Sequence, residues 1–214
     1  MSSFIKSSDK YLMDLSKARC LSLSLAELKS IQSYFAGIGR EPSEAELETF
    51  AQTWSEHCCH KTFKGVFLTS EGEVKNLLKE TIARATKELN KGWCFSVFVD
   101  NAGIIDFEGD YALSFKVETH NHPSALEPFG GAATGVGGVI RDTLGVWATP
   151  LYNTDVLCFG LLDEKNVPKG VKSPSYLFTG VVSGIASYGN NIGLATVNGS
   201  VFFDESYTGN PLVF

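Results

Sequence analysis

Residues 113–123 read Leu-Ser-Phe-Lys-Val-Glu-Thr-His-Asn-His-Pro, and the order of these side chains predicts both a strand and a site. Successive side chains of a strand point to opposite faces of the sheet. One face would carry the apolar side chains of Leu113, Phe115 and Val117. The opposite face would carry a cation, a carboxylate and two imidazoles, from Lys116, Glu118, His120 and His122. Because proline cannot donate to a sheet, the strand should end at or just before Pro123, with both histidines at its end.

A glycine-rich run follows at 130–138 and reads Gly-Gly-Ala-Ala-Thr-Gly-Val-Gly-Gly. Small residues let a backbone approach a ligand, and free amides near a helix start bind anions, so the run is interpreted as a phosphate cradle. The alternative is that these residues pack a helix against a sheet, since the Walker pattern is absent. Just beyond the run, Arg141 offers a bidentate phosphate donor and Asp142 a carboxylate for a metal ion.

The composition excludes several classes of protein. With 214 residues, 43% of them apolar, the chain can form one domain or a closely joined pair with a proper core. A net charge of -6 without a basic run argues against nucleic-acid binding. The sequence has no apolar stretch of membrane-spanning length and no secretion signal, so we expect no membrane association and a cytoplasmic location. The five cysteines are scattered and odd in number, which suits reduced thiols.

Two capping boxes predict two helices in the first quarter of the chain. Ser24 with Glu27 begins a short amphipathic helix that ends at Gly37, and Ser43 with Glu46 begins a second one. The apolar face of the second helix is expected to continue to Cys58. Residues 1–23 carry little pattern and are expected to be a loosely attached lead-in.

The second helix should present the segment 55–61, which reads Ser-Glu-His-Cys-Cys-His-Lys. Cysteine, histidine and glutamate together suggest zinc, but the adjacent cysteines do not give a C-x-x-C spacing and no second ligand pair follows at a usable distance. A histidine at a helix end can also be a simple cap that interacts with the helix dipole. His57 and Lys61 are four residues apart, so they are expected to share a face that could meet a polar or anionic substrate.

Four further elements follow from apolar periodicity. A helix is expected within 74–89, a buried strand at 93–99, a second buried strand at 156–162 and a helix at 175–188. The C-terminal residues should contain one more strand and the start of another.

Three stretches together resemble phosphoribosylformylglycinamidine synthase, the glutamine-dependent amidotransferase of purine biosynthesis. They are 54–61, 116–142, and 184–193 taken with 207–213. The resemblance runs from about Glu44 to the end and identifies the chain as an N-terminal fragment of such an enzyme. It implies an α+β fold of the aminoimidazole ribonucleotide synthetase type (PurM-like), with a mixed or antiparallel sheet flanked by helices. A helical linker region at 1–63 would precede an ATP- and substrate-binding domain at 64–214.

The resemblance also implies a carbon-nitrogen ligase that converts formylglycinamide ribonucleotide (FGAR) to formylglycinamidine ribonucleotide (FGAM). ATP, with Mg²⁺, would phosphorylate the amide oxygen, and ammonia from a glutaminase subunit or domain would displace the phosphate. A second PurM-like half, or a second copy in a homodimer, would complete the active site. The fragment alone is therefore expected to be inactive.

Roles for individual residues come from the same resemblance. The catalytic residues would be His57 and His120, and the ATP contacts would be His60 and Lys116. The substrate contacts would be Thr119, His120, Asn121, His122 and Arg141. The magnesium ligands would be Glu118 and Asp142. Phosphoryl transfer requires positioning and charge neutralisation, which a lysine, metal-binding carboxylates and backbone amides supply, so these residue types suit the chemistry.

Other interpretations of the same residues lead to different classes of protein. Another PurM-like ATP-dependent synthetase would share the fold but should lack the His-Asn-His-Pro-Ser motif. A metal-dependent hydrolase could use His120 and His122 as ligands, but it would need further histidines and the chain has four in all. A non-catalytic assembly module would dimerise through an exposed sheet edge.

Overall fold

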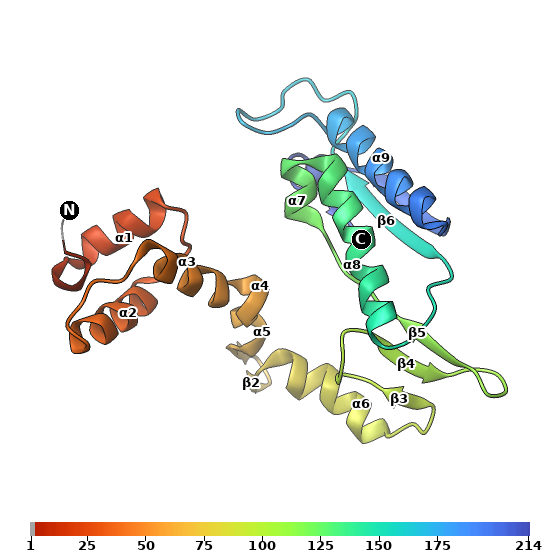
Figure 1. The fold of residues 1–214 in the computed structure, drawn as a ribbon, viewed down its shortest axis with the longest axis horizontal. Helices are drawn as coiled ribbons and strands as arrows, with labels where there is room; N and C mark the ends of the chain where they lie inside the picture. Colours follow the sequence, from red (N-terminus) through yellow and green to blue (C-terminus); the bar gives the residue numbers. More distant parts are fainter. Residues whose placement is uncertain (1–2) are drawn as a thin grey trace. The chain divides into compact units, whose positions relative to one another are not determined.

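The computed structural model describes residues 3–214, and the chain divides after Leu89 into two compact units (Figure 1). Each unit has its own hydrophobic core. Residues 64–89 belong to the first unit. The expected boundary between a linker region and a ligand-binding domain, at residues 63 and 64, stays a prediction.

The first unit is mainly helical. Its elements are η1 (Phe4–Lys6), α1 (Asp9–Ala18), α2 (Leu25–Gly37), α3 (Glu44–Thr53), α4 (Glu56–Cys59), α5 (Lys61–Lys64), the antiparallel hairpin of β1 (Val66–Thr69) and β2 (Gly72–Lys75), the π-helix η2 (Leu78–Ala83) and α6 (Arg84–Leu89). Both expected capping boxes are present, with Ser24 capping α2 and Ser43 capping α3. The helix expected within 74–89 starts later, because Val74 lies in strand β2.

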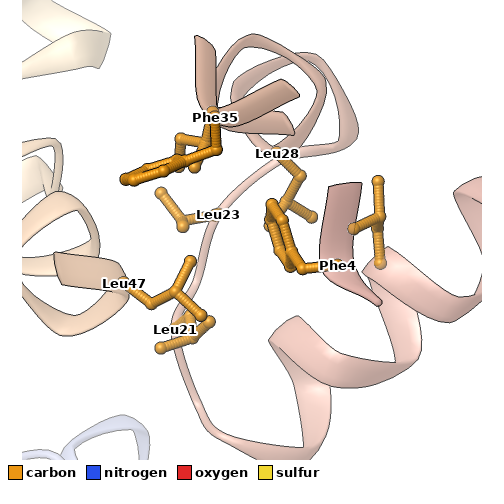
Figure 2. Packing of buried hydrophobic residues seen from close by; sticks show 8 residues of the cluster. Phe4, Leu21, Leu23, Leu28, Phe35 and Leu47 are labelled. Atoms are coloured by element: carbon orange, nitrogen blue, oxygen red, sulfur yellow. The ribbon is translucent and has the colours of Figure 1, made fainter. Parts of the chain in front are cut away.

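The core of the first unit includes the segment that was expected to be a loose lead-in. Phe4, Leu21 and Leu23 pack with Leu28, Phe35 and Leu47 (Figure 2). Leu12 of α1 is fully buried in the same cluster. Fully burying a large apolar side chain contributes about 1.5–3 kcal/mol, which explains why residues 4–23 pack against α2 and α3. The expectation of a loose lead-in is wrong for residues 3–23, and residues 1–2 lie outside the described part.

Helix α3 is shorter than its apolar pattern indicated. It ends at Thr53, and the side chain of Ser55 accepts a hydrogen bond from the amide of Cys58 to cap the new helix α4. Cys58 is therefore exposed and does not extend the apolar face of α3. The chain starts a new helix here and does not continue α3, because the serine side chain satisfies an amide that a helix start leaves without a partner.

The second unit combines two three-stranded sheets with three α-helices and one 3₁₀ helix. Its elements are β3 (Cys94–Ser96), β4 (Gly103–Asp106), β5 (Ala112–Phe115), α7 (Asn121–Leu126), α8 (Pro128–Gly145), β6 (Asn153–Phe159), α9 (Pro174–Ile192), β7 (Thr196–Phe203), η3 (Glu205–Tyr207) and β8 (Leu212–Val213). Strands β3, β4 and β5 form an antiparallel sheet in that order. In the other sheet β6 is central, parallel to β7 and antiparallel to β8. The expected α+β fold with mixed and antiparallel sheets is confirmed.

Helices α8 and α9 lie side by side next to β6 (Figure 1). The core between these elements consists of buried residues of α8, α9, β6 and β8, namely Ala132, Leu157, Phe159, Leu177, Val181 and Val213. The strand expected at 156–162 and the helix expected at 175–188 are both present here as β6 and α9. This core fixes helix α8, which carries the glycine-rich run and Asp142.

The structure corrects the expected strand over 113–123. Strand β5 ends at Phe115, whose partner Gly103 is the first residue of β4, so the sheet offers no pairing beyond this point. His122 and Pro123 lie in the first turn of α7, where a proline is tolerated because amides there have no partner within the helix.

The strand expected at 93–99 is shorter and less buried than the apolar pattern indicated. Only Cys94–Ser96 form β3, and Phe95 is 59% exposed. A three-residue edge strand with an irregular register cannot hide each large side chain that flanks it.

Within residues 3–214 no helix has both the length and the apolar character needed to cross a membrane.

Candidate active site

Lys116, Glu118 and Asp142 form one ionic cluster in the second unit. The Nζ atom of Lys116 lies 2.9 Å from Oδ2 of Asp142 and 3.4 Å from Oε2 of Glu118. Lys116 and Glu118 come directly after β5, and Asp142 comes from the last turns of α8. Of the four residues predicted to share a strand face, Lys116 and Glu118 therefore do meet, although the backbone between them is not a strand.

The cluster is partly shielded from water. The side chain of Lys116 is 18% exposed. Burial lowers the pKa of Lys116, but the carboxylates of Asp142 and Glu118 outweigh burial, so the pKa is raised overall. The ammonium group stays charged at neutral pH and can face the phosphate groups of a nucleotide.

The two carboxylates fit a magnesium ion better than a structural metal ion. Mg²⁺ is usually held by one or two carboxylates together with substrate phosphates and water. No group of three or more His, Cys, Asp or Glu side chains is arranged to hold a metal ion in residues 3–214. Glu118 and Asp142 supply two oxygen donors beside a cation, which matches a metal ion that arrives with a nucleotide.

His120 follows Glu118 by two residues in the chain, and several hydrogen bonds hold it in place. Its Nδ1 atom lies 2.5 Å from the carbonyl oxygen of Gly131, and its amide donates to the carbonyl oxygen of Val213 at 2.8 Å. The hydroxyl of Ser124 donates to the carbonyl oxygen of His120 at 2.7 Å. The ring and the backbone of His120 are therefore fixed by α7, α8 and β8 together.

The glycine-rich run forms the interior of α8 and does not form a loop around a phosphate. Glu127 caps this helix, and its side chain and carbonyl oxygen accept the amides of Gly130 and Gly131. A Cβ atom on Gly135 would lie 2.9 Å from Cβ of His120. The glycines let α8 approach the histidine segment and α9 closely. Close packing of a helix, the alternative expectation, therefore explains the glycine-rich run, and its partners are the histidine segment and helix α9.

The remaining predicted substrate contacts lie at different depths. Thr119, His122 and Arg141 are exposed, whereas Asn121 is half-buried. The Oδ1 atom of Asn121 accepts the amide of Val213 at 2.8 Å. Asn121 therefore helps to fix the segment to β8, while Thr119, His122 and Arg141 are accessible to a ligand.

The segment 55–61 in the first unit is built differently. His57 is exposed on the four-residue helix α4, and His60 adopts the left-handed conformation, with φ of 52°, between α4 and α5. The expected shared face of His57 and Lys61 is wrong, because His60 breaks the helix between them. Lys61 instead forms an ion pair with Glu27 of α2, with 2.7 Å between Nζ and Oε1.

Sequence reasoning missed the residues that hold the site. Ser124 is fully buried, and its position four residues after His120 is the spacing at which a serine hydroxyl commonly bonds back to a helix carbonyl. Val213 is far away in the chain and acts through its backbone, so no local signal could have identified it. The carbonyl of Gly131 is invisible to a search for chemically active side chains.

Comparisons with known proteins identify the family of this chain. Residues 99–214 match the family described as "AIR synthase related protein, N-terminal domain", and residues 12–61 match "Formylglycinamide ribonucleotide amidotransferase linker domain". A relative from Thermoplasma acidophilum, the PurL subunit of phosphoribosylformylglycinamidine synthase, is 43% identical over 205 residues, which cover 96% of this chain and 25% of the relative.

Two solved structures of PurL from Thermotoga maritima resemble this chain at 35% identity. The one complexed with FGAR gives a TM-score of 0.59, and the one complexed with ATP gives 0.58. Each match covers 89% of this chain and about a quarter of the other. The chain thus spans about a quarter of the length of the relatives that it matches.

Proposed function

Because this chain belongs to the family of AIR synthase related proteins, whose N-terminal domain it contains, we propose that it is part of a phosphoribosylformylglycinamidine synthase. The similarity to PurL over 96% of the chain supports this proposal. The observation that carries it is the cluster of Lys116, Glu118 and Asp142, which offers a nucleotide one cation and two carboxylates.

The proposed reaction amidates FGAR to FGAM in purine biosynthesis. The amide oxygen of FGAR attacks the γ-phosphorus of ATP, and ADP leaves. Ammonia then adds to the activated carbon, loses a proton and displaces inorganic phosphate, which gives the amidine. Such phosphoryl transfer depends mostly on positioning and on charge neutralisation.

Three residues of the second unit form the nucleotide side of the site in this proposal. Lys116 binds the phosphates, and Glu118 and Asp142 would hold a Mg²⁺ ion, which would supply positive charge beside the phosphates. By resemblance, His60 is a further ATP contact. The ATP complex of the Thermotoga maritima relative supports nucleotide binding by this family.

The acceptor side uses the histidine segment. His120 accepts the proton that ammonia loses, because a neutral imidazole is a suitable base near neutral pH. Thr119, Asn121, His122 and Arg141 bind FGAR, and Arg141 can pair with its phosphate through two parallel hydrogen bonds. By resemblance, His57 is a second catalytic histidine.

The proposed enzyme needs partners beyond this chain. A glutaminase subunit or domain supplies ammonia, and a second PurM-like half or a second copy completes the cleft. The 214 residues alone then bind ligands without completing the reaction. We place the enzyme in the cytoplasm, where the nucleotides of purine synthesis are found.

Calorimetric titration of ATP into this chain, with and without Mg²⁺, tests the nucleotide site. We expect Mg²⁺-dependent binding that weakens about tenfold or more in Glu118→Gln and Lys116→Met, since each removes a charged contact. Glu73→Gln is a matched control, because Glu73 forms an ion pair with Lys75 in the exposed hairpin of the first unit. This control should bind like the unchanged chain.

Two results would contradict the proposal. One is nucleotide binding that is unaffected by Glu118→Gln and Lys116→Met. The other is the absence of Mg²⁺-dependent binding both in this chain and in the full-length gene product.

A further inference from the structure

We propose that Gly131 and Gly135 of helix α8 are positioning residues that hold His120 in a single tautomer, with Nε2 presented to the substrate. The inference rests on the proposed role of His120 as a base. It adds the means by which the fold selects which ring nitrogen can take the proton.

The contact with Gly131 determines the tautomer. Nδ1 of His120 lies 2.5 Å from the carbonyl oxygen of Gly131, and a carbonyl oxygen can only accept a hydrogen bond. Nδ1 must therefore carry the proton. A neutral imidazole has one N–H group, so Nε2 keeps a free lone pair.

The space at Gly135 lets the ring reach this position. A Cβ atom on residue 135 would lie 2.9 Å from Cβ and 3.2 Å from Cγ of His120. Real Cβ contacts almost never come that close, so one of the two segments would have to move. Cβ of His120 cannot swing away as the end of a flexible side chain would, because it is attached directly to the backbone.

The backbone of His120 is itself tied down on both sides. Its amide donates to Val213 of β8 and its carbonyl accepts from the buried Ser124. The amide of Val213 donates in turn to Asn121, so β8 holds residues 120 and 121 at two points. Any retreat from a larger residue at position 135 would break these hydrogen bonds.

Gly131 also depends on having no side chain. A Cβ atom there would lie 2.4 Å from the carbonyl carbon of Pro123, which is a backbone atom. The missing side chain lets α8 approach the start of α7 and brings the Gly131 carbonyl to the imidazole. Gly131 and Gly135 lie one helical turn apart and differ in effect. Gly131 allows contact with α7, and Gly135 leaves room for the side chain of His120.

Nitrogen NMR of the imidazole rings tests the inference without any turnover. The chain has four histidines, so ¹⁵N-histidine labelling gives few signals, and His120→Gln assigns those of His120. The spectra are recorded about two pH units above the ordinary pKa of a free imidazole, which is about 6.5. We expect His120 to show a protonated Nδ1 and an unprotonated Nε2, whereas a neutral imidazole free in water prefers its proton on Nε2.

Gly135→Ala should change both the ring signals and the rate. The His120 signals should shift toward the Nε2-protonated form, and kcat of the full-length gene product should fall roughly tenfold to hundredfold with KM little changed. Gly145→Ala is the control on the same helix, because a Cβ atom there meets nothing within 4 Å. It should leave both measurements unchanged.

Two outcomes would overturn the inference. The first is an Nε2-protonated His120 in the unchanged chain, which decides the matter even if Gly135→Ala fails to fold. The second is a folded Gly135→Ala protein with unaltered ring signals or unaltered kcat. Since the NMR measurement needs no nucleotide, its failure is separate from a failure of the magnesium-ATP titration.

Discussion

The two histidine segments of this chain are built in opposite ways. His120 is held through its amide, its carbonyl and its ring by three different elements of the second unit. His57 and His60 are exposed on and between two helices of four residues each. The difference teaches that one residue type can be fixed by packing between distant elements or left accessible on short local ones.

The largest expected effect breaks the scaffold that supports His120. A Cβ atom on Gly184 of α9 would lie 2.2 Å from the carbonyl oxygen of Phe129 in α8. Gly184→Ala should lower the free energy of unfolding by about 3 kcal/mol, because two packed helices must separate. Urea denaturation followed by circular dichroism measures the loss.

Gly145→Ala serves as the control for this effect as well. It adds the same methyl group where nothing lies within 4 Å, and alanine favours a helix over glycine. It should be neutral or slightly stabilising. Equal losses in both variants would contradict the close packing of α8 on α9.

A smaller effect should follow from removing the hydrogen bond that the buried Ser124 donates to His120. Ser124→Ala leaves the half-buried carbonyl of His120 without its partner, the hydroxyl of the buried Ser124, which should cost about 1–2 kcal/mol. Ser183→Ala removes the same type of serine-to-carbonyl bond on the exposed face of α9 and should stay within about 0.5 kcal/mol of the unchanged chain. Urea denaturation measures the free energy of unfolding of both variants. Equal losses would mean that the hydrogen bond from the buried Ser124 does not hold His120 more firmly than an exposed bond would.

The smallest effect concerns the segment of His57 and His60. Burial raises the pKa of Glu27, but hydrogen bonds from Lys61 and Ser24 together outweigh burial, so the pKa lies below its usual 4.5. This carboxylate is therefore expected to contribute stability above pH 4.5 that is lost as the pH falls through the lowered pKa. Lys61→Met should cost at most about 1 kcal/mol at pH 7.

Thermal unfolding from pH 7 down to pH 3 measures this difference. The gap in Tm between Lys61→Met and the unchanged chain should shrink as Glu27 becomes protonated. Lys29→Met is the control, since it removes the more exposed ion pair with Asp9 in the same unit. A gap that stays constant over this range would contradict the role of the Lys61–Glu27 pair.

Local sequence signals predicted many elements of the fold because their causes are local. The capping boxes at Ser24 and Ser43 and the apolar periodicity of α9 each act within a few residues of the chain. The strand predicted from Pro123 is wrong, since proline ends a strand but is equally suited to the first turn of a helix. Local pattern could not choose between the two, because the choice depends on where β4 stops pairing with β5.

The sequence by itself determined the chemistry of this protein. It placed a lysine, two carboxylates and a run of histidines within about thirty residues, and those residue types limit what the site can bind. The tertiary structure decided which of them meet. Lys116 reaches Asp142, and His120 is oriented by a glycine carbonyl of α8 and by a strand that lies more than ninety residues away, because such contacts depend on packing between elements that no local pattern encodes.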